Sequence, residues 1–136
     1  MFIFEIIINS ILVGIILSTQ FVSYPLFLTV NQNQFKMYHD FYTKSVSYIV
    51  VPFMLIEIFT NAFNLYNIND VYPLYFVSTF LLLFIWLSTI LIQVPLHNSI
   101  NLDYDTLQIK QLINSNWIRT ILWISKLLIL VNIKEI

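Results

Sequence analysis

Four apolar segments, each long enough or nearly long enough to cross a lipid bilayer, dominate this sequence. They cover about residues 2–27, 46–65, 73–96 and 116–131. A membrane-spanning helix needs about 20 predominantly apolar residues, because the hydrocarbon core is about 30 Å thick. The last segment lies at the lower edge of that length. The pattern predicts one all-α domain over residues 1–136, an integral membrane antiparallel four-helix bundle.

Composition supports a lipid environment. Hydrophobic residues make up 59% of the 136 residues and charged residues only 10%, whereas soluble domains carry about 25% charged residues. A chain of this size cannot bury so much apolar surface in a globule that faces water. The net charge of −1 gives no indication of a nucleic-acid partner. The absence of cysteine excludes disulfides, thiolate metal sites and thiol catalysis.

Prolines and polar stretches set the expected helix limits. Pro25 is expected to bend or end the first helix and Pro52 to kink the second, because a proline ring removes one backbone hydrogen bond and crowds the preceding turn. Polar connectors are expected at 29–45 and 98–115, with a short turn at 67–70. The second half of the first connector is also compatible with an extension of the second helix.

An even number of spans places both termini on the same side of the membrane. Lys36, Lys44, Lys110 and Arg119 belong to the opposite side, that of the two polar connectors, and Lys134 to the side of the termini. Because positive charge is enriched in cytoplasmic connectors, this distribution favours non-cytoplasmic termini. The expected location is the bacterial inner membrane.

Small residues recur every fourth position in the first segment, at Ser10, Gly14 and Ser18. Such a stripe allows two helices to approach closely. It predicts packing within the bundle, or an association surface for a homo-oligomer or a larger membrane complex.

Polar side chains from every segment fall at one level, close to the polar connectors, if each residue advances its helix by about 1.5 Å. In lipid these side chains should turn inward, so we expect them to form a ligand-binding pocket. The predicted set consists of Gln20, Tyr24, Tyr38, His39, Gln93, His97, Asn98, Asn116, Trp117 and Arg119. Of these, His39, His97 and Arg119 are the candidate catalytic residues.

Glu57 and Lys126 are expected much deeper in the bundle. Glu57 lies about 17 Å below Val46, and Lys126 about 15 Å below Asn116, at the rise of a regular helix. The two are compatible with a buried ion pair. Alternatively, Lys126 extends to the nearer interface, and an unpaired Glu57 stays protonated.

His39 and His97 permit three interpretations. Two histidines from neighbouring spans at one level could ligate a haem or a metal ion. They could instead close the free backbone groups of helix ends, or take part in proton transfer. No additional ligand at metal-binding spacing accompanies them.

The sequence around Asn116, Trp117 and Arg119 also has two interpretations. Tryptophan anchors helices at the headgroup level, and an arginine near a helix end can extend to lipid phosphate. Alternatively, Arg119 and the free N–H groups of a helix start hold an anionic, enol or phenol oxygen of a ligand.

The motifs Q-V-P-L-H-N at 93–98 and N-W-I-R-T at 116–120 resemble those of a loose superfamily of small bacterial four-helix membrane proteins, most of them uncharacterised, which includes anthrone-oxygenase-like proteins. Tyr38-His39, Pro52 and Glu57 resemble the second helix of its uncharacterised members. The resemblance implies oxidation of polycyclic phenols without an obvious cofactor. It also implies a set of site residues: Val94, Pro95, His97, Asn98, Asn116 and Arg119. His97 stands where asparagine is more usual in the oxygenase branch.

Three functions follow as hypotheses. The first is binding of a small ligand or cofactor, with oxygenase-like chemistry as one form. The second is a non-catalytic accessory subunit of a larger membrane complex. The third is a proton pathway through Glu57, His39 and Lys126, which the lack of an inverted repeat disfavours.

Overall fold

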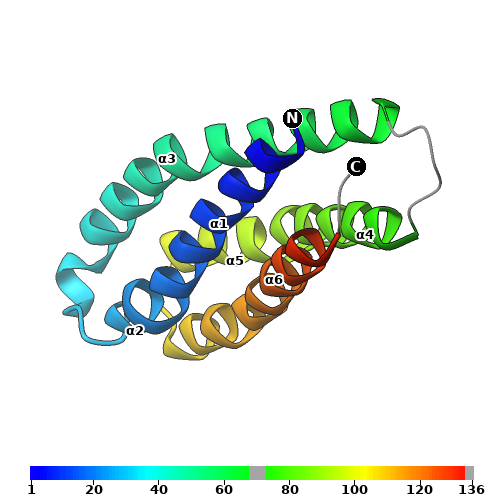
Figure 1. The fold of residues 1–136 in the computed structure, drawn as a ribbon. Helices are drawn as coiled ribbons and strands as arrows, with labels where there is room; N and C mark the ends of the chain where they lie inside the picture. Colours follow the sequence, from blue (N-terminus) through cyan, green and yellow to red (C-terminus); the bar gives the residue numbers. More distant parts are fainter. Residues whose placement is uncertain (68–72, 134–136) are drawn as a thin grey trace.

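The computed structural model describes residues 1–67 and 73–133, and this part of the chain is all-helical, as predicted. Four helical rods follow one another (Figure 1). Of the turn expected at 67–70, Asn67 ends a helix and the other residues lie outside the described ranges. The elements are α1 (Phe2–Ser18), η1 (Thr19–Ser23), α2 (Tyr24–Leu26), α3 (Gln32–Asn67), α4 (Pro73–Ser88), η2 (Thr89–Gln93), α5 (Val94–Leu102) and α6 (Thr106–Asn132).

The connectors are much shorter than the sequence predicts. Helix α3 has 36 residues and continues through Pro52 without interruption, which gives a rod about 54 Å long. Helix α6 starts at Thr106, where the Asp105 carboxylate accepts the Leu107 backbone N–H at 2.8 Å. The predicted connectors at 29–45 and 98–115 are therefore mostly helix, because their residues are polar but contain no helix breaker.

Three of the four rods are long and apolar enough to cross a membrane: Phe2–Leu26, Gln32–Asn67 and Pro73–Leu102. Helix α6, the fourth predicted span, does not meet that criterion of length and composition. Its charged residues Arg119 and Lys126 are nevertheless 7% and 0% exposed. The polarity that lowers the hydropathy of α6 is therefore turned into the protein, towards the first and third rods, against which α6 packs.

Two five-residue π-helical segments interrupt the first and third rods at equivalent places. In η1 the N–H of Tyr24 bonds to the Thr19 carbonyl, and in η2 the N–H of Val94 bonds to the Thr89 carbonyl. A proline follows each wide turn directly, at Pro25 and Pro95. Proline clashes with the carbonyl four residues earlier, and the wider turn gives that carbonyl room.

The π-helical segments η1 and η2 also change which side of the first and third rods faces inward. Thr19 and Tyr24, five residues apart, are both buried, as are Ser88 and Gln93. In a regular α-helix, positions five apart would point in directions that differ by about 140°. The pattern Ser-Thr-x5-Pro occurs at 18–25 and again at 88–95. The two rods are thus built alike, and each brings a glutamine, Gln20 or Gln93, to α6.

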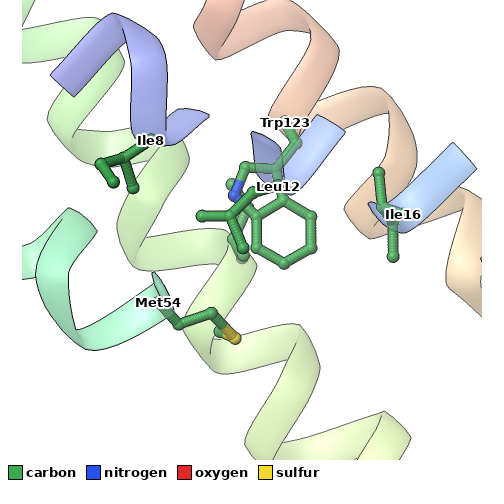
Figure 2. Close-up of a cluster of buried hydrophobic side chains, with 6 residues drawn as sticks. Ile8, Leu12, Ile16, Met54 and Trp123 are labelled. Carbon is green, nitrogen blue, oxygen red and sulfur yellow. The ribbon is translucent and has the colours of Figure 1, made fainter. Parts of the chain in front are cut away.

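The buried side chains form three clusters along the rods. Aromatic and aliphatic residues near the connectors form one around Phe27, Phe35 and Ile109, and Tyr75 and Leu130 form another at the end where both termini lie (Figure 1). The middle layer consists of Ile8, Leu12, Ile16, Met54, Ile85 and Trp123. In Figure 2, Met54 and Trp123 face Leu12 from two other helices.

The small-residue stripe of α1 faces outward. Ser10, Gly14 and Ser18 are all exposed, and a Cβ placed on Gly14 would meet no atom within 4 Å. Packing of this stripe within the bundle, one of the two interpretations of the sequence, is therefore wrong. Its use as an association surface stays a prediction.

Candidate functional site

Arg119 is the centre of a buried polar cluster at the middle of α6, which begins at Thr106 rather than near Asn116. Its Nε and Nη2 donate to Asn116 Oδ1 at 3.1 and 2.6 Å, one turn earlier on α6. The Asn116 amide in turn donates to Gln20 Oε1 at 2.9 Å. Longer contacts of 3.5 Å lead from Arg119 to Thr89 and Gln93 in η2. The two π-helical segments thus position the groups that hold the guanidinium.

A hydrogen-bonded relay leads from Arg119 to the connector side. Arg119 Nη2 donates to the Tyr24 hydroxyl at 3.2 Å, which lies 2.9 Å from His97 Nε2. His97 Nδ1 is 2.9 Å from His39 Nε2, and His39 Nδ1 is 3.4 Å from Asn101 Oδ1. The relay therefore consists of Arg119, Tyr24, His97, His39 and Asn101, and it draws on four of the helical rods.

The ends of the relay define the direction of its hydrogen bonds. Arginine only donates, and a carboxamide oxygen only accepts. Tyr24 therefore accepts from Arg119, and Asn101 Oδ1 accepts from His39 Nδ1–H. In neutral rings, His39 Nε2 then accepts from His97 Nδ1–H, and His97 Nε2 accepts from the Tyr24 hydroxyl. Both histidines are neutral Nδ1–H tautomers in this arrangement.

This direction is testable by nitrogen NMR. In protein labelled with 15N-histidine, both His39 and His97 are expected to show the Nδ1–H tautomer. Tyr24→Phe removes the donor to His97 Nε2, while His39 Nε2 still accepts from His97 Nδ1–H, so the tautomer should persist and the His97 Nε2 resonance should shift. The exposed Tyr48→Phe serves as the matched control. An Nε2–H tautomer at either histidine in the unmodified protein would contradict the assigned direction.

A cavity of about 310 Å³ lies beside the relay. Tyr24, His39, Gln93, His97, Asn98, Asn101 and Arg119 line its polar end. The remaining walls combine aliphatic side chains of α1 and α3 with the hydroxyl groups of Thr19, Tyr42, Thr43, Ser47 and Thr89, and Leu12, Met54 and Trp123 of the middle layer line the far end. Its volume is at the lower end of the range for small-molecule sites, which is roughly 300–1,000 Å³.

Arg119 has no carboxylate partner in the described part of the chain. The ion pairs found there involve only Lys126, Glu5 and Glu57. A buried cation is costly unless an anion compensates it. Among the residues described, only neutral oxygen acceptors surround Arg119. The guanidinium therefore gives the cavity a positive end that suits an acidic ligand.

The two histidines are hydrogen-bonded to each other rather than arranged as axial ligands. Axial ligation of a haem places the two nitrogens on opposite sides of the iron, about 4 Å apart at an iron–nitrogen distance of about 2 Å. His39 Nε2 and His97 Nδ1 are 2.9 Å apart, and both other ring nitrogens have partners. Residues 1–67 and 73–133 contain no cluster of three metal-binding side chains. This geometry does not support the haem or metal interpretation.

The structure brings most of the predicted site residues together, but in different roles. Tyr24, His39, Gln93, His97, Asn98 and Arg119 line the cavity, whereas Gln20 and Asn116 lie behind Arg119 and hold it. Tyr38 packs edge-on against Phe27 and does not line the cavity. Trp117 is 40% exposed and packs against Phe21, because it follows Asn116 by one residue and so points away from the cluster.

A second polar cluster lies beyond the middle layer. Lys126 Nζ is 3.1 Å from Glu57 Oε1, the partner expected from the sequence, and 3.0 Å from Glu5 Oε1. Asn9 and Trp123 also donate to Glu57, at 2.8 and 3.2 Å. All three charged side chains are fully buried. Lys126 therefore does not extend to an interface.

Glu5 has the larger set of donors in this cluster. Its second oxygen accepts the Tyr75 hydroxyl at 2.6 Å and the Asn64 amide at 2.7 Å, and its first oxygen accepts the Asn61 amide at 3.0 Å. These contacts satisfy a carboxylate that would otherwise be unstable away from water. Asn9 is fully buried and bonds to Glu57 through its amide nitrogen, while its carbonyl oxygen has no partner within residues 1–67 and 73–133.

Sequence reasoning missed several of these residues. Glu5 shares a helical face with Asn9, one turn on, and this spacing was the available signal for a polar cluster. Asn101 and Tyr75 carried no comparable signal. Asn101 meets His39 because α5 continues through the predicted connector. Thr89 shares a helical face with Gln93, one turn on, and this spacing was its signal.

The chain has no detectable similarity to characterised proteins. No protein-family model matches the sequence, and no curated protein or solved structure gives a match. Function therefore has to be argued from the site itself.

Proposed function

We propose that this protein binds a small organic acid in the cavity beside the relay. The buried Arg119, which lines the cavity without a carboxylate partner in the described residues, is the observation that carries this proposal. A bound carboxylate or acidic phenol would supply the missing negative charge. Charge-assisted hydrogen bonds of this kind are about twice as strong as neutral ones.

The relay gives such a site a route for a proton. The Tyr24 hydroxyl is both a neighbour of Arg119 and a donor to His97, so a proton lost by a bound acid could pass through Tyr24 and His97 to His39. His39 in turn bonds to the half-buried Asn101 near the connector side. The resemblance to anthrone-oxygenase-like proteins implies a phenolic ligand, and deprotonation of that phenol is the step the relay would perform.

Ligand-dependent stabilisation tests this function. Purified protein in detergent would be heated with benzoate, decanoate or 1,8-dihydroxyanthraquinone. A ligand that binds only the folded state raises the melting temperature in proportion to its occupancy. At least one acid is expected to do so. Arg119→Gln should weaken its binding by about 10- to 100-fold, because a hydrogen bond to a charged group contributes about 1.5–3 kcal/mol.

Two controls define the contribution of charge. Lys110→Gln removes a positive charge from an exposed position of α6, and binding is expected to be unchanged. Decylamine, which carries a positive charge, is expected to leave the melting temperature unchanged. If Arg119→Gln and the unmodified protein respond equally to every acid, the proposed function is wrong.

The site is proposed to lie in a multi-pass membrane protein of the bacterial inner membrane, with the four rods packed as an antiparallel bundle and both termini on the non-cytoplasmic side. Three rods of sufficient length and hydropathy support this placement. Accessory-subunit function is the second candidate, favoured by the outward-facing Ser10, Gly14 and Ser18. Purification in mild detergent as a uniform particle of this chain alone would count against that second function.

A further inference from the structure

The cavity is long relative to its volume. On α3 its lining runs from His39 to Met54, an advance of fifteen residues along the helix, which corresponds to about 22 Å. On the opposite wall it runs from Tyr24 to Leu12 of the first rod. A cavity of about 310 Å³ that extends about 22 Å along α3 is a narrow channel. Such a shape fits a linear chain better than a compact ring system.

Polarity changes along this channel. His39, His97 and Asn101 lie at the connector end and Arg119 at the inner end of the relay, whereas Val50 and Met54 line α3 towards the far end, near Trp123. The middle-layer residues, some of them labelled in Figure 2, lie between this far end and the buried charges of Glu5, Glu57 and Lys126. A molecule that meets Arg119 with an acidic head and fills the far part of the channel therefore needs an apolar tail.

One long side of the channel reaches the outer surface between α3 and α5. Ser47 and Val51 of α3 and Val94 and Asn98 of α5 line the cavity and are also exposed, Val51 by 46% and Val94 by 49%. Both helices belong to rods that are apolar enough to span a membrane. In a bilayer, this opening would face the lipid, because it lies on the outer side of two rods that the hydrocarbon would surround.

We propose that the ligand is a single-chain amphiphile with an acidic head, such as a free fatty acid, which enters sideways from the bilayer between α3 and α5. Its carboxylate pairs with Arg119, and its chain lies along Val46, Val50 and Met54. This inference rests on the proposed function and specifies its ligand class. It requires the ligand to be dissolved in the membrane, whereas the proposed function does not.

Photolabelling in lipid vesicles tests the inference. The probe is palmitic acid with a diazirine in its chain, and the labelled peptides are identified by mass spectrometry. Labels are expected on the cavity-facing residues of α3. Val51→Trp and, independently, Val94→Trp should narrow the opening and lower this labelling by at least about tenfold. Phe84→Trp, on the exposed face of α4, is the matched control and should leave labelling unchanged.

The head group is tested in the same vesicles. Arg119→Gln is expected to lower labelling by palmitic acid by at least about tenfold, and the matching diazirine alcohol should label the cavity much less than the acid. Circular dichroism confirms that each variant is folded. Equal labelling by acid and alcohol, or labelling that neither tryptophan reduces, would overturn the inference.

Failure of the membrane-derived ligand can be distinguished from failure of the proposed acid-binding function. If benzoate stabilises the protein in an Arg119-dependent way but the palmitic acid probe does not label α3, the acid site stands and the membrane-derived ligand is wrong. The same conclusion follows if the tricyclic phenol alone stabilises the protein. If neither stabilisation by an acid nor labelling by the palmitic acid probe depends on Arg119, both proposals are wrong.

Discussion

Replacing Lys126 with methionine is expected to lower the free energy of unfolding by about 3–5 kcal/mol. Methionine keeps much of the length and apolar surface of lysine but removes its charge. Glu5 Oε1 and Glu57 Oε1 both lie within 3.1 Å of Lys126 Nζ. Without that cation, two fully buried carboxylates would face each other uncompensated. Unfolding followed by circular dichroism in mixed detergent measures the change.

A second substitution separates charge from packing. Glu57→Gln in the Lys126→Met background removes one of the two carboxylates, while Glu5 keeps its donors Asn61, Asn64 and Tyr75. The double variant should therefore be more stable than Lys126→Met alone, since residues in one ionic network are not additive. Lys110→Met, at an exposed position, should change stability by no more than about 0.5 kcal/mol. If the double variant is less stable than Lys126→Met alone, this account of the cluster is wrong.

Replacing Asn116 with leucine is expected to have the second large effect, about 3–5 kcal/mol of destabilisation. The Asn116 carbonyl oxygen accepts two bonds from Arg119, and each bond to a charged donor contributes about 1.5–3 kcal/mol. Leucine has a similar size, so the loss reports the hydrogen bonds rather than a cavity. The released guanidinium should also lose its orientation towards Tyr24, so binding of an acidic ligand should weaken in the assay proposed for Arg119→Gln.

Removing the charge as well should recover much of this stability. In Arg119→Met/Asn116→Leu, no buried cation is left without an acceptor, and the two apolar side chains can pack against each other. The neighbouring Asn114→Leu, at an exposed position of the same helix, should have little effect. Equal destabilisation by Asn114→Leu and Asn116→Leu would mean that the bonds to Arg119 contribute nothing specific.

The depth of each residue along its helix could be predicted from the sequence. Glu57 and Lys126 were placed at one level from the rise per residue alone, and their charged atoms lie 3.1 Å apart. His39 and His97 were likewise expected at one level, and their rings are hydrogen-bonded. Depth is predictable because it depends only on the number of residues counted along a regular helix.

The direction in which each side chain points was decided by the tertiary structure. The wide turns in η1 and η2 change the inward face of two rods in mid-course, so regular spacing could not show which atoms of Tyr24 and Thr89 contact Arg119. Trp117 shares its depth with Asn116 but points outward. The cavity also has no signature in any one segment, since its walls come from four rods.

By itself, the sequence determined an all-helical chain with an apolar exterior, because hydropathy and the rise of a helix are local properties. It also predicted that charged groups would turn inward, since lipid would not solvate them. Only the tertiary structure decided that Glu5 joins Glu57 at Lys126 while Arg119 has no carboxylate partner among the described residues. Which charges meet depends on the rotation of each helix against its neighbours, and packing across the whole bundle fixes that rotation.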